Sequence, residues 1–552
     1  MRGVRFLPLL IAAACAAPKS PPPPAQPEQR PARGAAGPAA PDRVTLVFSA
    51  SVAGQIVPCG CSPDQHGGLP RAAAYLRKLR QTEPDLLFVD AGDLLFETFA
   101  RPPAQMLTQK QLKARTLAQG DVLLGAAARA VGQRDLALGA SFVAEAAGGI
   151  PLLDTGVAPV PGARGTLIAS AGPVKVGLFA AGFEQDVAAT LAARARALRE
   201  QGARIVVLVL HPRGPAAFTA AQALLPPARE AGVDVVVLGR RDDPAADPNA
   251  KDPGLPPLLA VEGNGQSLLR LDVHLGDGPL SLAPTAEDRN QELKGLDARI
   301  ERFRLQLAAA PQRREQLQAK IRELDERKRA LLATPLPEPA PGTSWAQATF
   351  VPLTKELGAD ADAQKLVDAY DQKVTELNLA EAQRQPESCP SPGPGEASFV
   401  GVAKCAKCHE DATAFWTETK HAHAYETLVT VKKQFSLDCI QCHVTGWQQP
   451  GGICRIDRTQ VGGPGVSGRG VGRQDVQCED CHGPGSEHVK DGTGAFIQLQ
   501  VPASSCIRCH EAANSPHFDD VKYRPYIVGP GHGLPLAKGE KPLPRPGGPH
   551  HE

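Results

Sequence analysis

The sequence predicts a multi-domain protein with a layered α/β domain, a helical hairpin and a C-terminal domain rich in cysteine and histidine. Three observations support this. Short β-branched runs alternate with amphipathic helical stretches between residues 44 and 275, apolar residues recur every three or four positions between 287 and 332, and four similar Cys/His pentapeptides lie between 405 and 510. A chain of 552 residues, 42% hydrophobic and 22% charged, is long enough for several such domains.

The composition argues against two classes of protein. Lys and Arg total 60 against 59 Asp and Glu, so a net charge of +1 offers no electrostatic basis for a nucleic-acid partner. No stretch reaches the roughly 20 consecutive apolar residues that span a bilayer. The 54 Gly and 53 Pro residues predict long linkers and loops.

The first residues indicate export. Arg2 and Arg5 precede a short apolar run, which is the pattern of a signal peptide over residues 1–14. The run Ile11-Ala12-Ala13-Ala14-Cys15 resembles a bacterial lipobox, with Ala12 where Leu is usual, and this implies lipidation of Cys15. A plain cleaved signal is the alternative. Residues 15–43, rich in Pro and Ala, are expected to form a tether, so we expect a lipoprotein at the periplasmic face of the cell envelope that meets the membrane through its anchor.

Residues 44–285 are expected to form the α/β domain with a largely parallel sheet. Its expected strands cover residues 44–49, 86–91, 174–180, 204–210, 233–238 and 268–275, and its expected helices cover 69–80, 187–201 and 216–230. Ligands in such folds bind beyond the carboxyl ends of the strands. The loops of interest therefore follow Ser49, Ala91, Leu138, Leu210 and Leu238.

Those loops carry a resemblance to a known family. The segments that carry it are Val57-Pro58-Cys59-Gly60-Cys61 with Gly67-Gly68, Asp90-Ala91-Gly92-Asp93, Val209-Leu210-His211 and Val261-Glu262-Gly263-Asn264-Gly265. Together they resemble the 5'-nucleotidase branch of the calcineurin-like metallophosphoesterases. The resemblance implies a centre of two metal ions that clamp the attacking and leaving oxygens of a phosphate ester. Of the ligands that the family uses, Asp93 and His211 are matched.

The other ligand positions of that family are not matched. Ser51-Val52-Ala53 stands for Asp-x-His, Gly139-Ala140-Ser141 for Gly-Asn-His, and Gly239-Arg240-Arg241-Asp242 for Gly-His-x-His. Two ligands do not hold a dinuclear centre, and arginines place positive charge where cations would bind. We therefore expect a degenerate site without a divalent metal. The alternatives are a rebuilt hydrolase site with Asp242 and Asp243 as replacement ligands, and a soft-metal or disulfide role for Cys59 and Cys61.

Residues 286–334 have helical periodicity that Pro311 interrupts, which predicts an antiparallel helical hairpin. We expect this hairpin to be a spacer or a protein contact face. Residues 335–397 are expected to hold one helix, over 360–379, and a Pro-rich linker.

The last quarter of the chain carries the chemistry. Four C-x-x-C-H pentapeptides end at His409, His443, His482 and His510, and their cysteines are Cys405, Cys408, Cys439, Cys442, Cys478, Cys481, Cys506 and Cys509. Two residues between the thiols let both reach the vinyl groups of one haem, and the adjacent His then lies under the ring as the proximal ligand of the iron. A zinc ribbon would use the thiols without needing each histidine.

The sixth ligand of each iron determines what a haem does. The chain has only two methionines, Met1 and Met106, and neither lies in this region, so the irons are either bis-His or open. The histidines that remain as candidates are His421, His423, His488, His517 and His532. Bis-His ligation predicts low-potential electron carriers, and an open iron predicts binding of a small ligand.

Further segments of this region carry a resemblance, namely 399–408, Trp416, His421-Ala422-His423-Ala424, 439–452, 478–488 and Asn514-Ser515-Pro516. Over about 135 residues they resemble the tetrahaem cytochrome c554 family. The resemblance implies a mostly helical fold packed around four haem c groups over residues 398–535, with residues 536–552 as a disordered tail. It also implies three bis-His haems, with His421, His488 and His532 as the better distal candidates and one iron without a sixth ligand. The family pattern has a single His at this place, so His423 is an additional histidine. It is a candidate for the sixth ligand of the remaining iron.

Cys389 and Cys454 are left over, either as a disulfide or as two free thiols. The sequence thus favours an exported electron carrier that exchanges electrons with redox proteins or small redox substrates. Phosphoester hydrolysis in the N-terminal domain is one alternative. Haem-based turnover of a small nitrogen or sulfur compound is the other.

Overall fold

The computed structural model describes residues 43–58, 65–214, 217–239, 249–250, 254–261, 263–309, 311–336, 339–386, 388–459, 472–511, 514–515, 518–529 and 531–532. These described residues belong to one compact unit. Several residues singled out in the sequence lie outside the described ranges, namely Cys15, Cys59, Cys61, Asp242, Asp243 and His517, together with the expected signal peptide and tail. None of the helices in the described ranges is both long and apolar enough to cross a membrane.

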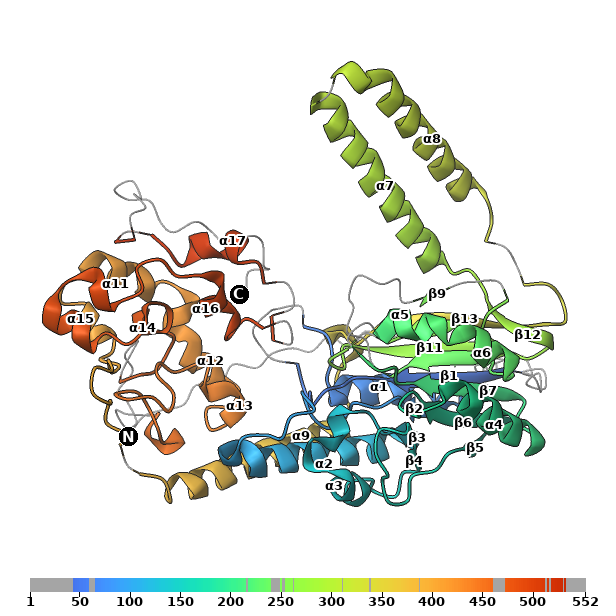
Figure 1. The fold of residues 1–552 in the computed structure, drawn as a ribbon, viewed down its shortest axis with the longest axis horizontal. Coiled ribbons are helices and arrows are strands. Elements are labelled where there is room, and N and C mark those ends of the chain that lie inside the picture. Colours follow the sequence, from blue (N-terminus) through green and yellow to red (C-terminus); the bar gives the residue numbers. More distant parts are fainter. Residues whose placement is uncertain are drawn as a thin grey trace, which may run out of the picture. The chain divides into compact units, whose positions relative to one another are not determined.

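The described strands of the N-terminal part form two sheets where one was expected (Figure 1). The first has the order β12-β13-β11-β1-β2-β3-β4, formed by Arg43–Ser49 (β1), Leu87–Asp90 (β2), Ala126–Ala130 (β3), Leu152–Leu153 (β4), Ser267–His274 (β11), Asp277–Leu282 (β12) and Thr343–Pro352 (β13). Strands β1 to β4 are parallel, and β11 pairs antiparallel with both β1 and β13.

The second sheet has the order β5-β6-β7-β8-β10-β9. Its strands are Leu167–Ala171 (β5), Val174–Ala181 (β6), Ile205–Leu210 (β7), Val235–Leu238 (β8), Asn249–Ala250 (β9) and Leu258–Ala260 (β10). Strands β6, β7, β8 and β10 run parallel, whereas β5 and β9 are antiparallel to their neighbours. The expected strands are all present, with ends shifted by at most two residues.

The two sheets pack face to face through a shared apolar core. Phe48 and Val89 of the first sheet and Leu178 and Val207 of the second belong to the same buried cluster. Alternate residues of the strands point outward and pack under helices, so the first sheet is covered by α1 (Leu69–Leu79), α2 (Leu107–Leu124) and α9 (Ala361–Ala382), and the second by α4 (Val187–Glu200), α5 (Ala217–Ala223) and α6 (Leu225–Glu230). The result is a layered α/β domain, as expected.

Three differences from the sequence prediction have physical causes. The helix expected over 216–230 is two helices, because Pro226 and Pro227 lie in the first turn of α6 and cannot continue the hydrogen bonds of α5. Helix α2 was missed because it lacks a clear apolar stripe. Strand β13 lies in the segment that was expected to hold a helix and a linker. It was missed because it forms by pairing with β11, which lies on the other side of the helical hairpin in the sequence.

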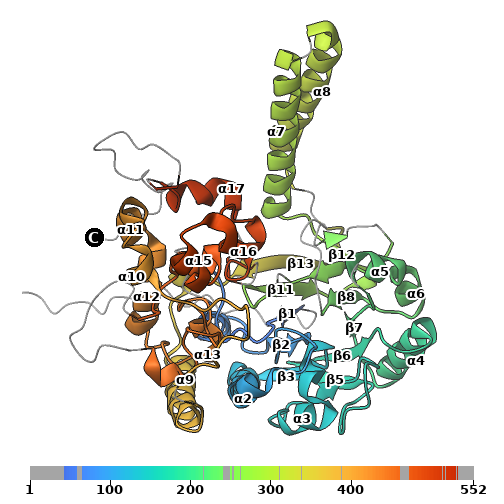
Figure 2. The same cartoon turned by 60° about the vertical axis from the view of Figure 1, so that its left-hand side comes forward.

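The hairpin consists of α7 (Ala286–Ala309), a 3₁₀ turn at Pro311–Arg313 and α8 (Arg314–Ala333), which lie side by side and antiparallel (Figures 1 and 2). Leu296 and Ile300 pack against Leu324 in its apolar seam. Arg327 pairs with Glu292 at 2.7 Å across the two helices. The hairpin is thus as expected.

The C-terminal part consists of short helices. They are α10 (Val402–Cys405), α11 (Glu410–Thr417), α12 (Ala424–Thr430), α13 (Leu437–Ile440), α14 (Cys478–His482), α15 (Ser486–Asp491), α16 (Ala503–Ile507) and α17 (Asp520–Tyr523). The other described elements are α3 (Ala140–Glu145) and the 3₁₀ turns Ala104–Met106, Arg134–Leu138, Lys355–Leu357, Lys420–His423, Ile456–Arg458, Gly494–Phe496 and Arg524–Tyr526. Tyr425, Leu428 and Ile440 centre a small apolar cluster.

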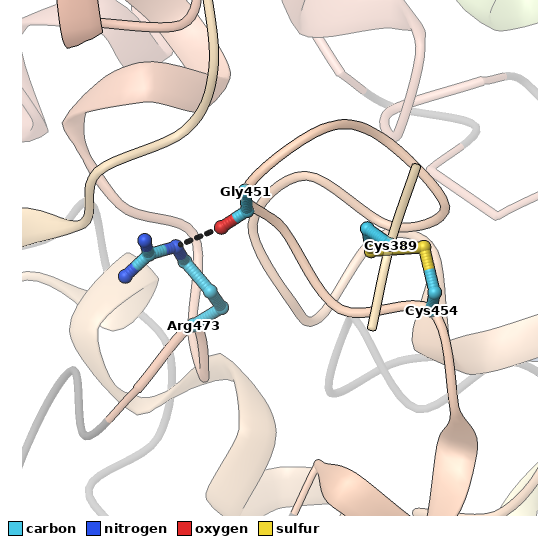
Figure 3. Close-up of a disulfide and its surroundings, with 4 residues drawn as sticks. All are labelled: Cys389, Gly451, Cys454 and Arg473. Carbon is cyan, nitrogen blue, oxygen red and sulfur yellow. Dashed lines mark hydrogen bonds between the residues drawn. A yellow bond between two sulfur atoms is a disulfide. The ribbon is translucent and has the colours of Figure 1, made fainter. Parts of the chain in front are cut away.

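Cys389 and Cys454 form a disulfide with an S–S distance of 2.08 Å (Figure 3). It joins the segment after α9 to the loop that follows the second C-x-x-C-H motif. Arg473 fastens the same loop, since its Nε donates to the Gly451 carbonyl at 3.0 Å and its guanidinium also donates to the Phe399 carbonyl at 2.9 Å. Of the two possibilities that the sequence left open, a disulfide or two free thiols, the structure shows the disulfide.

Candidate functional site

Each C-x-x-C-H motif lies on a tight helical turn. His409 N donates to the Cys405 carbonyl at 2.9 Å, and His510 N donates to the Cys506 carbonyl at 3.0 Å. Positions i, i+3 and i+4 of a helical turn share one face. Both thiols and the imidazole of a motif are therefore presented on the same side, as covalent haem attachment requires.

Thiols of different motifs come together in two pairs. Cys405 of the first motif is hydrogen bonded to Cys478 of the third, and this bond lowers the pKa of the Cys405 thiol. Cys509 of the fourth motif is hydrogen bonded to Cys442 of the second, which likewise lowers the pKa of Cys509. The first motif thus lies beside the third, and the second beside the fourth.

Three histidines that end a motif each lie opposite another histidine. The ring centroids are separated by 6.0 Å between His409 and His488, 6.2 Å between His510 and His421, and 6.2 Å between His482 and His532. Two imidazoles that bind one metal ion from opposite sides, each through a bond of about 2 Å, place their ring centres roughly 6 Å apart. The spacing therefore fits one haem iron between each pair.

The hydrogen bonds of these rings also suit metal binding. His482 Nδ1 lies 2.7 Å from the Gln498 carbonyl oxygen, and His443 Nδ1 lies 2.5 Å from that of Ala424. Among the histidines outside the motifs, His488, which lies opposite His409, has its Nδ1 2.7 Å from the Thr493 carbonyl oxygen. A carbonyl accepts only from a protonated nitrogen, so Nδ1 carries the proton and Nε2 keeps its lone pair for a metal.

Burial keeps the His421–His510 pair neutral. Burial, aided by nearby His510, lowers the pKa of His421 to about 4, and burial also lowers the pKa of His510. Neutral imidazole is the form that binds a metal ion. The residues present therefore fit a haem group at this pair as well.

His443 and His423 are arranged differently from the three pairs. His423 Nδ1 lies 3.4 Å from the Glu426 carboxylate, on the 3₁₀ turn that precedes α12. Within the ranges that the structure describes, His443 is the motif histidine that lies outside the three close ring pairs.

A second candidate site lies at the edge of the α/β domain, where the loops that resemble the metallophosphoesterases meet. Asp93 follows β2 and is fully buried, and His211 follows β7 with its Nε2 2.6 Å from the Ala91 carbonyl oxygen. Asp93 adopts a left-handed backbone (φ 55°). The structure thus brings these two residues to one edge of the fold.

The loop that faces Asp93 is 132–135, whereas Gly139-Ala140-Ser141 forms the start of α3. Arg134 N donates to Asp93 Oδ1 at 2.8 Å, and the Arg134 guanidinium lies 4.0 Å from the same carboxylate. Asp135 accepts backbone hydrogen bonds from Asp93, Leu95 and Gly132 at 2.8 to 3.0 Å. Burial and the charge of Asp93 raise the pKa of Asp135 to about 6.

Sequence reasoning missed this loop because the strand before it, β3, reads Ala-Ala-Ala-Arg-Ala and lacks the β-branched residues that signal a strand. In the described ranges, no group of three or more His, Cys, Asp or Glu side chains is placed to hold a metal ion.

Comparison with known proteins agrees with the resemblance of the C-terminal part. Residues 404–483 match the family model described as "Cytochrome c554 and c-prime". A segment of 116 residues is 34% identical to cytochrome c-554 of Nitrosomonas europaea. The match covers 18% of this chain and 45% of that cytochrome, so the chain spans about half the length of its relative.

The fold is similar to solved phosphoesterase-type structures. The sulfate thiohydrolase SoxB of Thermus thermophilus has a TM-score of 0.40 at 14% identity and covers 61% of each chain. A 5'-nucleotidase precursor from the same species has 0.38 at 15%, covering 65% of this chain and 62% of its own. The calcineurin-like phosphoesterase YfkN of Bacillus subtilis has 0.37 at 11%, covering 60% and 97%. Such identities and scores say nothing of activity. The findings establish that a C-terminal region similar to cytochrome c554 is joined to a two-sheet α/β domain in this chain.

Proposed function

We propose that this protein is a c-type cytochrome of the cell envelope that carries electrons through four covalently bound haem c groups. The observation that carries the proposal is the set of four C-x-x-C-H turns, three of which place their histidine about 6 Å from a second imidazole. A bound haem supplies an iron that accepts and releases one electron.

The chain's own residues have distinct roles in this proposal. The eight motif cysteines form thioethers, and His409, His443, His482 and His510 are the proximal ligands. His488, His421 and His532 are the distal ligands that face His409, His510 and His482. The carbonyl groups of Gln498 and Thr493, which accept from Nδ1, orient the rings of His482 and His488.

The short distances between cysteines of different motifs support electron transfer between the haem groups. The contacts of Cys405 with Cys478 and of Cys442 with Cys509 join the first motif to the third and the second to the fourth. Cys481 of the third motif also interacts electrostatically with Cys506 and Cys509 of the fourth, which joins the two pairs. Groups attached to the four motifs would therefore lie close together and form a relay. Redox proteins or small redox substrates exchange electrons with it.

A second candidate function concerns His443. Its ring has no counterpart among the three described pairs, and the sequence candidate His423 faces Glu426 instead. An iron at this motif with an open sixth position would bind a small ligand, so the same domain would turn over a small nitrogen or sulfur compound.

In this proposal the α/β domain is a platform without a divalent metal. The Arg134 guanidinium lies beside Asp93, and His211 contacts the Ala91 carbonyl oxygen, so a cation and a backbone atom stand close to the two matched ligands. The signal peptide would take the chain out of the cytoplasm, to the side of the membrane on which haem c is attached. Lipidation of Cys15 would anchor it to the membrane.

One preparation tests the proposal. Matured full-length protein is titrated with a reductant while its optical and low-temperature EPR spectra are followed, and the same sample is assayed with a nitrophenyl phosphate ester and Mn²⁺. We expect low-spin haem signals that reduce reversibly and no hydrolysis. Metal-dependent hydrolysis that Asp93→Ala abolishes would instead assign the hydrolase function, and cyanide binding to a high-spin haem would favour the second candidate.

A further inference from the structure

Helix α2 of the α/β domain presents three polar side chains to the second C-x-x-C-H motif. Gln109, Lys110 and Lys113 lie at positions i, i+1 and i+4 of this helix, and all three side chains are largely buried. Buried lysines are rare unless they are paired. Their partners therefore show what this surface of α2 is for.

The two lysines form a buried ion cluster with a residue of the motif region. Lys113 Nζ lies 2.8 Å from Glu97 and 2.9 Å from Asp438, and Lys110 Nζ lies 2.6 Å and 2.8 Å from the same two carboxylates. Burial alone would raise the pKa of the Asp438 carboxyl, yet Lys113 and Lys110 hold it well below its usual range. Asp438 directly precedes Cys439, the first cysteine of the second motif.

An amide network holds the helix that carries Cys439. Gln109 Oε1 accepts from Leu437 N at 3.0 Å, at the first residue of α13. Asn378 of α9 donates to Gln109 Oε1 at 2.7 Å and to the Phe435 carbonyl at 2.8 Å. A helix of four residues leaves its first N–H groups without intrahelical partners, so α13 receives its N-terminal cap from the α/β domain.

Helix α9 connects the two parts of this arrangement. Its Val367 and Tyr370 pack in the apolar cluster of the α/β domain, whereas Ala382 at its end packs with Tyr425 and Ile440 of the C-terminal part. Tyr370 is buried and interacts electrostatically with Lys113, Asp438 and Cys439. Charged groups of the platform therefore lie close to the second attachment site.

We propose that the α/β domain is a structural part of the second haem site, and that the Glu97–Lys110–Lys113–Asp438 cluster both positions Cys439 and sets the reduction potential of the haem attached there. This inference rests on the proposed function, because it requires haem at the second motif. It gives the domain a role that does not depend on a phosphoesterase activity.

The test is the redox titration of full-length matured protein carrying Lys113→Gln or Asp438→Asn. A positive charge near a haem favours the reduced state. Lys113→Gln leaves the cluster with excess negative charge, so one component of the titration shifts to lower potential. Asp438→Asn leaves excess positive charge, so the same component shifts to higher potential. The other components stay in place.

Two further variants control the experiment. Arg115→Gln removes one positive charge from the same helix, but Arg115 is half exposed and pairs with Glu145, so it should shift no component. Lys113→Arg keeps the charge and should retain the wild-type potential. If Lys113→Gln is not recovered folded, Lys110→Gln makes the same charge change and should shift the component in the same direction.

A pyridine haemochrome assay separates the two ways of failing. Absence of covalent haem in the unmutated protein overturns the proposed function itself. Normal haem content with no shift, or with shifts of the same sign in Lys113→Gln and Asp438→Asn, overturns only the role assigned to the platform.

Discussion

A histidine binds iron through one ring nitrogen, so the partner of the other nitrogen decides whether the side chain is ready to act as a ligand. His482 and His488 both have Nδ1 2.7 Å from a backbone carbonyl oxygen. His482 is a proposed proximal ligand of one iron, and His488 is a proposed distal ligand of another. The motif spacing identifies His482 from sequence alone. His488 could be named only as a candidate, because its partner His409 lies 79 positions away in the chain and no local pattern joins them.

Substitution of a distal histidine tests this pairing. In His488→Ala we expect one haem to lose its sixth ligand and change from low to high spin, and to gain cyanide binding, while the other haems are unaffected. EPR and optical titration with cyanide measure this. Lys490→Ala, an exposed residue of the same helix α15, should leave both spectra unchanged. An unchanged spin state in His488→Ala would show that His488 is not a ligand.

The loop beside Asp93 shows what sequence prediction misses at the level of single residues. Asp93 and His211 could be named from the sequence because they match ligand positions of the family that these loops resemble. Arg134 and Asp135 could not, since the alanine-rich β3 gives no strand signal, and the neighbouring Gly139 was taken for the loop. Only the fold shows that Arg134 approaches Asp93.

Among the elements, the segment between α9 and the second motif depends on a covalent link. The Cys389–Cys454 disulfide closes a loop with a sequence separation of 65 residues. Closing a loop of this length restricts the unfolded chain and stabilises the fold by about 4 kcal/mol. Sequence counting left both cysteines over but could not pair them, because pairing depends on distance in the folded chain.

The double variant Cys389→Ser/Cys454→Ser should therefore unfold at lower denaturant, with a loss of about 4 kcal/mol in the free energy of unfolding. Denaturant titration followed by circular dichroism measures this, with thiol labelling of the unmutated protein as a control for the bond. Unchanged stability, or two thiols that label without reduction, would contradict the link.

The ion cluster on α2 and α13 predicts a pH dependence. The pKa of Asp438 in the fold is held below its usual value of about 4, so the unfolded chain takes up protons first as the pH falls. The stabilisation is fully present above about pH 4 and is lost as the pH falls further toward the folded pKa. Lys110, Lys113, Glu97 and Tyr370 are the titratable groups that face Asp438.

Asp438→Asn should accordingly lower the free energy of unfolding by about 3 kcal/mol at neutral pH, because it leaves buried lysine charge without its partner. The difference from the unmutated protein should shrink as the pH falls below about 4, because Asp438 is protonated in the unfolded chain before it is protonated in the fold. Urea titrations at several pH values check this. A difference that does not change with pH would mean that the cluster stabilises through packing rather than charge.

Helix α13 also shows why some elements escape prediction. Four residues are too few for a helix to form alone, and its cap Gln109 comes from 328 positions earlier in the chain. Strand β13 also depends on a partner that is distant in the sequence, since it pairs with β11 on the other side of the helical hairpin. Long periodic segments such as α7 and α8 carry their own signal and are found from sequence.

At the scale of the whole molecule, the two parts of the chain differ in what holds them together. The α/β domain has an extended apolar core between two sheets, whereas the main described apolar cluster of the C-terminal part is small and centred on Tyr425 and Ile440. In our account the remaining stabilisation of the C-terminal part comes from haem, contacts with the platform and one disulfide.

The proposed function requires haem to be bound covalently at all four motifs. The most direct measurement is the intact mass of matured protein, together with the haem content of the same sample by the pyridine haemochrome assay. We predict a mass that exceeds that of the processed polypeptide by four haem groups, and four haems per chain. A colourless protein, or a mass equal to that of bare polypeptide, would contradict the account.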